Sequence, residues 1–308
     1  MVASALEDQQ MLSYDVVDVF TDRPFAGNQL AVVHGAEELS TEQCLAIAQE
    51  FNYSETTFPA PRGEDEYFTR IFTPGGEIPF AGHPTLGTAW VLREKGLLAS
   101  GSVVQHCGAG EIGVAFLADG AVELSAVPRD LVGPVDDALV ASILEDVGLS
   151  ISDVAGPVWL GGTGLTFVHL SVTEDAVGRA RPSFRPLHEY ADRLAAVGTC
   201  VDPVEGINLH HVSGSAPDVA VHSRVFVPGL AVAEDPATGS AAAGLGLALV
   251  AAGRLPEGGR YTITQGVEMG RPSQLFGRVD VSDGVPTRCH VAGRVQRIAS
   301  GQIAVPPA

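Results

Sequence analysis

A short internal repeat is the feature that most constrains how this chain can fold. Residues 70–74 (RIFTP) recur as residues 224–228 (RVFVP), 154 positions later and therefore half of the 308-residue length. Each copy leads into a loop of small residues that opens a helix, at residues 81–87 (AGHPTLG) in the first half and residues 235–241 (DPATGSA) in the second. Self-similarity at a fixed distance indicates a repeated structural unit, so we predict two similar domains.

The fold class that the repeat predicts is α+β, with two pseudo-symmetric domains that each wrap an antiparallel sheet around a central helix. The length agrees, since a domain usually has about 100 to 200 residues. We expect the first domain at residues 14–128 together with roughly 291–306, and the second at residues 129–290. Residues 1–13 show no periodicity, which predicts a flexible tail.

Local patterns place the individual helices and strands. Residues 40–43 (STEQ) offer a helix start signal. Residues 52–59 look like a short polar connection, in which Glu55 could be just a solvated loop charge. The helices expected from periodicity and flanking residues are 41–51, 84–95, 137–147, 187–197 and 242–251. The strands expected are 14–20, 29–34, 68–72, several within 102–125, 158–160, 166–171, 208–212, 222–227, 261–265, 273–281, 289–298 and 302–305.

The charge and hydropathy of the chain exclude several kinds of partner. The net charge of −19 comes from 37 acidic and 18 basic residues, whereas binding to phosphate backbones needs clustered Lys and Arg. We therefore expect neither nucleic acid nor an anionic membrane surface as a partner. The sequence has no apolar run of 18 residues, and its amino terminus lacks the basic and apolar regions of a signal peptide. These features predict a soluble cytoplasmic protein.

The cysteines do not form a metal-binding or disulfide pattern. They stand far apart, with no C-x-x-C pair and no histidine at ligand spacing, so we expect buried free thiols and no metal. Residues 108–113 (GAGEIG) fit the dinucleotide fingerprint, but a hairpin over residues 114–127 follows where that fingerprint needs a helix. The four cysteines are Cys44, Cys107, Cys200 and Cys289.

Residues 234–241 (EDPATGSA) form the strongest candidate binding site. The first turn of a helix has unpaired amides and the positive end of the helix dipole, which together bind anions. In the simpler interpretation, Thr238 or Ser240 only caps the helix. If the two halves face each other across a cleft, both helix amino termini could hold one carboxylate. His83, Asp235 and Glu55 would then stand around it, a group suited to general acid and base chemistry.

The chain resembles the PhzF family, the isomerases of phenazine biosynthesis and their homologues, which share the diaminopimelate-epimerase-like fold. The resemblance extends from Asp15 onward and departs at Gln29, where family members usually have proline. Several long motifs in the same order carry the resemblance: residues 25–28 (FAGN), 54–55, 70–87, 234–241 and 265–273.

The resemblance implies a cofactor-independent isomerase that moves a proton between carbons of a small unsaturated carboxylic acid, in secondary metabolism. It implies that Glu55 is the acid/base and that His83 and Asp235 line the pocket and orient the substrate. It also implies a homodimer. The residues expected near the substrate carboxylate are Gly82, Thr238, Gly239 and Ser240.

Alternative interpretations of these residues and of the function stay open at this point. His83 could bond a backbone carbonyl, and Asp235 could cap a helix through its side chain. The whole protein could be a catalytically silent relative that binds a small acid or a protein partner. A racemase or epimerase with two facing cysteines is disfavoured, because Ala81 and Thr238 stand at approximately the loop positions where those enzymes have cysteine.

Overall fold

The computed structural model describes residues 10–183, 185, 189, 204–228 and 233–307. The chain divides into two compact units, and each is described by itself. Unit 1 comprises Met1–Leu124 with Arg294–Ala308, and unit 2 comprises Ser125–Gly293. The chain therefore leaves unit 1 for unit 2 and returns to unit 1 for its last strand.

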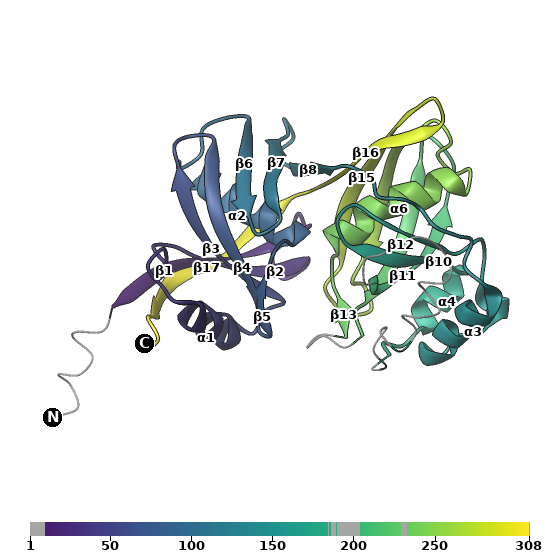
Figure 1. The fold of residues 1–308 in the computed structure, drawn as a ribbon, viewed down its shortest axis with the longest axis horizontal. Helices are drawn as coiled ribbons and strands as arrows, with labels where there is room; N and C mark the ends of the chain where they lie inside the picture. Colours follow the sequence, from purple (N-terminus) through teal and green to yellow (C-terminus); the bar gives the residue numbers. More distant parts are fainter. Residues whose placement is uncertain (1–9, 184, 186–188, 190–203, 229–232, 308) are drawn as a thin grey trace. The chain divides into compact units, whose positions relative to one another are not determined.

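Unit 1 is a sheet with two helices, α1 (Thr41–Phe51) and α2 (Gly82–Glu94) (Figure 1). Helix α1 begins with the predicted capping box, in which Ser40 and Gln43 each bond the other's backbone amide. The strands of unit 1 are β1 (Met11–Val19), β2 (Asn28–Val33), β3 (Glu55–Arg62), β4 (Glu66–Thr73), β5 (Gly76–Ile78), β6 (Ser102–Cys107), β7 (Gly110–Phe116) and β17 (Val295–Ala304). Strand β8 (Val122–Ala126) begins in unit 1, and its last two residues belong to unit 2.

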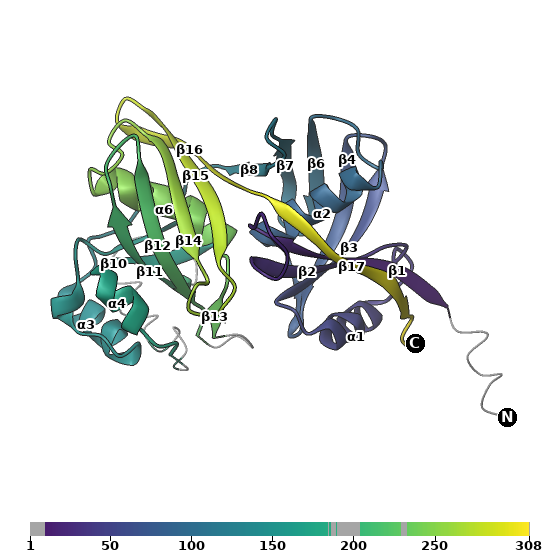
Figure 2. The same cartoon turned by 180° about the vertical axis from the view of Figure 1, so that it is seen from behind.

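Unit 2 has the same plan around helix α6 (Gly239–Ala251), with α3 (Asp137–Asp146), the 3-10 turn η2 (Ile151–Asp153) and α4 (Glu174–Arg179) added on one side (Figure 2). The helix expected at residues 187–197 lies outside the described residues. The strands are β9 (Trp159–Gly162), β10 (Thr166–Ser171), β11 (Val204–Ser213), β12 (Val219–Phe226), β13 (Glu234–Asp235), β14 (Gly259–Gln265), β15 (Ser273–Ser282) and β16 (Val285–Gly293).

Strand pairing confirms the repeat. In unit 1, β2 pairs with β3 in parallel, and β3 pairs with β4 antiparallel. Strand β4 also pairs with β5 antiparallel and with β6 in parallel, and β6 pairs with β7 antiparallel. In unit 2, β10, β11, β12, β13, β14 and β15 pair in the same order and the same directions. The predicted α+β class is confirmed. The sheets are mixed rather than purely antiparallel, because crossovers such as α2 bring strands back in the same direction.

Helices α2 and α6 are the centres of their units. Ten of the 13 residues of each are buried, as expected for a helix that strands surround. A β-carbon at Gly87 of α2 would lie 2.6 Å from Leu30 Cδ2, so strand β2 packs against the helix backbone at that point. The small-residue runs noticed in the sequence are therefore helix surfaces that other elements approach closely.

Three further sequence-based expectations are wrong. Glu55 begins strand β3 instead of lying in a loop. Residues 289–298 are not one strand, because the chain passes between units at Arg294 and splits the segment between β16 and β17. Cys44 and Cys289 are buried free thiols as expected, but Cys107 is partly exposed, and Cys200 is outside the described residues. Among the described helices, none is both long and apolar enough to cross a membrane.

Candidate active site

Unit 1 brings Glu55 and His83 together. Glu55 is the first residue of β3, and His83 is the second residue of α2. His83 Nε2 lies 3.5 Å from Glu55 Oε2, and the side chains are 5% and 16% exposed. The carboxylate and the imidazole therefore share a nearly enclosed position at the amino terminus of the central helix.

His83 is held by hydrogen bonds on both ring nitrogens. Its Nδ1 lies 3.2 Å from Asn28 Nδ2, and its Nε2 lies 3.2 Å from the Gln29 carbonyl oxygen. The Ser54 hydroxyl donates to Asn28 Oδ1 at 3.0 Å. Burial lowers the pKa of His83 to about 3, although the bond to Gln29 acts in the opposite direction. His83 is consequently a neutral imidazole at physiological pH.

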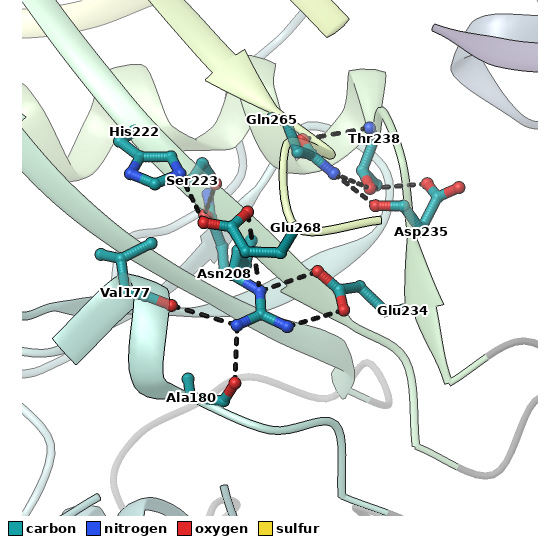
Figure 3. Close-up of polar contacts among 11 residues, drawn as sticks. Val177, Ala180, Asn208, His222, Ser223, Glu234, Asp235, Thr238, Gln265 and Glu268 are labelled. Atoms are coloured by element: carbon teal, nitrogen blue, oxygen red, sulfur yellow. Dashed lines mark hydrogen bonds and ion pairs between the residues drawn. The ribbon is translucent and has the colours of Figure 1, made fainter. Parts of the chain in front are cut away.

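Unit 2 brings Asp235 and Thr238 together (Figure 3). The Thr238 hydroxyl donates to Asp235 Oδ2 at 2.6 Å, and Gln265 Nε2 donates to the Asp235 carbonyl at 2.8 Å and to Thr238 Oγ1 at 3.1 Å. The Thr238 amide donates to Gln265 Oε1. Gln265 opens the motif at residues 265–273, but its bridging role follows only from the pairing of β14 beside β12.

The amino termini of α2 and α6 differ from those of α1 and α3. Ser40 and Asp136 cap α1 and α3 through their side chains, whereas Ala81 and Thr238, the N-cap residues of α2 and α6, make no side-chain cap. The capping role considered for Thr238 is thus wrong, because its hydroxyl is turned to Asp235. Gly82, Gly239 and Ser240 lie in the first turns of these two helices, where amides can bind an anion.

A buried ion pair precedes Asp235 in the chain. Arg224 donates from Nε and Nη2 to the two carboxylate oxygens of Glu234, each at 2.8 Å, and from Nη1 to the carbonyls of Val177 and Ala180 (Figure 3). Glu268 Oε2 lies 3.9 Å from Arg224 Nε. Because Arg224 ties Glu234 to the end of α4, it fixes the backbone from which the Asp235 side chain extends.

The repeat shows which of these groups have counterparts. Phe72 and Phe226 are equivalent, and each pairs with a residue of the preceding strand, Thr56 and Ile207 respectively. Glu55 is therefore equivalent to Gly206, and unit 2 has no carboxylate where unit 1 has its candidate base. The N-caps Ala81 and Thr238 are likewise equivalent, and neither is a cysteine.

Metal ligation has no support in the described part of the chain. No group of three or more His, Cys, Asp or Glu side chains there could hold an ion. The chemistry available is that of one enclosed carboxylate, a neutral imidazole and helix amides, which together can bind an acid and move a proton.

Solved structures show the class to which this fold belongs. The described chain matches a PhzF-family protein from Bacillus anthracis with a TM-score of 0.78 and 22% identity, over 96% of this chain and 99% of the other. It also matches hydroxyproline epimerase from Agrobacterium vitis with a TM-score of 0.59 and 16% identity, over 96% and 93% of the two chains. Both likenesses show the diaminopimelate-epimerase-like fold, which is the class that the duplicated topology defines.

Sequence comparisons give the family within that class. The model of the phenazine biosynthesis-like (PhzC-PhzF) family matches residues 17–301. An uncharacterised isomerase of Mesorhizobium japonicum is 35% identical over 96% of this chain and 99% of its own length. Trans-2,3-dihydro-3-hydroxyanthranilate isomerase of Pseudomonas chlororaphis is 32% identical over 95% and 99%. This chain belongs to the PhzF-like family, and it is an isomerase.

Proposed function

We propose that the protein is a cofactor-independent isomerase that moves a proton between two carbons of a small unsaturated carboxylic acid. Glu55 abstracts the proton and returns it to the second carbon. The observation that supports this most directly is the asymmetry of the repeat, with Glu55 beside neutral His83 in unit 1 and Gly206 at the equivalent position in unit 2. A single base acting at both carbons transfers the proton on one face of the substrate.

The other site residues bind and orient the substrate in this proposal. His83 and Asp235 orient the substrate, and the first-turn amides near Gly82, Gly239 and Ser240 bind its carboxylate. Thr238 acts through its hydrogen bond to Asp235. These roles require no metal and no organic cofactor. We further propose a homodimer, on family resemblance, and a cytoplasmic location, on the sequence features described above.

The substrate class rests on a named relative. One relative isomerises trans-2,3-dihydro-3-hydroxyanthranilate, a cyclic unsaturated amino acid, and its sequence aligns with 95% of this chain. A ring acid with a carbon-bound proton next to a conjugated double bond is therefore the class to test first. Such chemistry belongs to the biosynthesis of secondary metabolites.

Hydrogen exchange in heavy water tests the proposal. Wild-type protein should incorporate deuterium into trans-2,3-dihydro-3-hydroxyanthranilate or a related conjugated ring acid, and Glu55→Gln should lose at least about 10³-fold of the rate. Glu66→Gln is the matched control, because Glu66 also pairs with a histidine, His106, at 3.1 Å, but on the exposed side of unit 1. Equal rates for wild type and Glu55→Gln would reject Glu55 as the base.

The two rival functions give different results in the same assay. A silent binding protein should show binding of such acids without any exchange in wild type. A thiol-dependent racemase should lose activity when a cysteine is replaced, whereas we expect exchange to persist in Cys44→Ser, Cys107→Ser, Cys200→Ser and Cys289→Ser. Burial raises the pKa of the Cys289 thiol to about 12, which leaves it protonated and a poor base.

A further inference from the structure

The hydrogen bonds around His83 allow one arrangement of protons. The Gln29 carbonyl can only accept, so the hydrogen between it and His83 is on Nε2. In a neutral ring, Nδ1 is then an acceptor, and Asn28 must present its amide nitrogen to it. The Asn28 oxygen is left to accept, and the Ser54 hydroxyl donates to it. Each hydrogen bond in this series therefore joins one donor to one acceptor.

This arrangement determines what Glu55 faces. The same Nε2 that bonds Gln29 lies 3.5 Å from Glu55 Oε2. The alternative tautomer would present a lone pair to both oxygens, which repels the Glu55 carboxylate and the Gln29 carbonyl. Among the described residues, the hydrogen-bond and ion-pair partners of His83 are Asn28, Gln29 and Glu55, and Glu55 is the charged one.

We propose that Asn28 and Ser54 are positioning residues that hold His83 as the neutral Nε2–H tautomer, so that Nε2 donates its hydrogen to Gln29 and presents no lone pair to Glu55. Neither residue touches the reacting atoms; both act through the imidazole. The inference rests on the proposed function for its catalytic consequence, and on geometry alone for the tautomer.

Unit 2 contains an internal control for this proposal. The Ser223 hydroxyl donates to Asn208 Oδ1 at 2.6 Å, Asn208 Nδ2 lies 3.2 Å from His169 Nδ1, and His169 Nε2 lies 3.3 Å from the Gly161 carbonyl. A serine hydroxyl, an asparagine amide, a histidine ring and a backbone carbonyl thus form a second series of hydrogen bonds, from different strands. No carboxylate in the described ranges forms an ion pair with His169. The hydrogen bonds around His169 therefore have no acid/base residue beside them to affect.

Nitrogen-15 spectroscopy of labelled histidines tests the tautomer directly. The His83 signals, identified by their loss in His83→Gln, should show only the Nε2–H form in wild type. Asn28→Asp replaces a donor by a carboxylate that can only accept, so it should place a hydrogen on Nδ1 and make His83 titrate between about pH 5 and 7. Asn208→Asp should alter the His169 signals and leave those of His83 unchanged.

Exchange kinetics test the catalytic consequence. Asn28→Asp should lower kcat by about 10-fold or more, leave KM within about twofold, and add an ionisation to the pH profile. Ser54→Ala is the milder second variant, with a smaller loss in kcat that Ser54→Thr restores. Asn208→Asp should add no ionisation to the profile.

Three results would overturn the inference. The first is an Nδ1–H tautomer or a mixture in wild type. The second is a changed His83 spectrum in Asn28→Asp with an unchanged exchange rate and pH profile. The third is equal kcat loss in Ser54→Ala and Ser54→Thr. Failure of the proposed function can be told apart from failure of this inference. It would appear as full exchange activity in Glu55→Gln, while the nitrogen-15 spectrum would still show His83 as the Nε2–H tautomer.

Discussion

Glu55 and Gly206 occupy equivalent positions in the two halves of the repeat. Each pairs with a residue of the parallel neighbouring strand. Each also comes one residue before the first residue that pairs with β4 or β12. A β-carbon at Gly206 would lie 2.6 Å from the Phe226 carbonyl oxygen. The second half thus lacks a carboxylate and also lacks room for any side chain there. Glu55, the base in the proposed function, therefore has no counterpart at the equivalent position of unit 2.

The first prediction follows from this close approach. Gly206→Ala should lower the free energy of unfolding by about 1 to 3 kcal/mol, because the added methyl group overlaps a backbone carbonyl that is fixed in β12. Gly178→Ala is the control, since nothing lies within 4 Å of a β-carbon at that position in α4 and alanine favours a helix. Urea unfolding followed by fluorescence measures both. A Gly206→Ala variant as stable as wild type would contradict the packing described.

The second prediction compares two equivalent ion pairs. Arg70 and Arg224 begin the two copies of the repeat, and each donates from Nε and Nη2 to a glutamate of the next strand, Glu77 or Glu234. The first pair is 35% and 38% exposed, the second 5% and 8%. Arg224→Met should cost about 3 to 5 kcal/mol because it leaves a buried carboxylate unpaired.

Arg70→Met is the matched control for the buried pair. An exposed ion pair contributes at most about 1 kcal/mol, so this variant should unfold close to wild type in the same urea titration. Equal losses of unfolding free energy in the two variants would mean that burial does not determine how much the ion pair contributes to stability. Exchange activity should fall in Arg224→Met as well, because Glu234 precedes Asp235.

The repeat predicted the architecture from sequence because its two copies keep the residues that matter for pairing and charge. The RIFTP and RVFVP segments contain the last residues of β4 and β12, and the arginine in each makes the same bidentate contact. The capping box at Ser40 was also readable, since a helix start depends on four adjacent residues. Both signals are local or repeated, which is why one sequence sufficed.

The features that were missed depend on distant parts of the chain. Thr56 and Thr57 are polar and follow a polar stretch, which suggested a loop, yet both are buried in β3, and Thr57 bonds Thr88 of α2 at 2.8 Å. The break at Arg294 has no turn signal strong enough to show that the chain changes units there. His83 bonds Asn28 and Gln29, and Thr238 bonds Gln265. These partners are far away in sequence, so the residues around His83 and Thr238 do not predict the contacts.

The third prediction concerns pH and stability in unit 2. Burial lowers the pKa of His169 to about 3 and that of His210 to about 4. Both imidazoles are neutral when folded, whereas an unfolded histidine binds a proton below about pH 6.5. The unfolded state therefore binds more protons as pH falls from about 6.5 toward the folded pKa values, and stability that is present above pH 6.5 is progressively lost.

The size of this effect is measurable. Each of these histidines should contribute up to about 1.4 kcal/mol of lost stability per pH unit within that window. Trp159 lies in unit 2 and Trp90 in unit 1, so fluorescence in a Trp90→Phe background follows unit 2. The slope of unfolding free energy between pH 6 and 5 should decrease in His169→Gln and decrease further when His210→Gln is added. An unchanged slope in the double variant would show that the two residues are not buried neutral groups.

The last prediction concerns the hydroxyl of Thr238. Its hydrogen bond to the Asp235 carboxylate is a bond to an ionisable group, for which the usual contribution is about 1.5 to 3 kcal/mol. Thr238→Val keeps the shape and removes the hydroxyl, so kcat/KM for exchange should fall by about 10- to 100-fold. Thr238→Ser restores the donor and should stay within about threefold of wild type, while Asp235→Asn should lose at least as much as Thr238→Val. If serine and valine are equally impaired, the methyl group rather than the bond to Asp235 is what the site needs, and the role assigned to Thr238 is wrong.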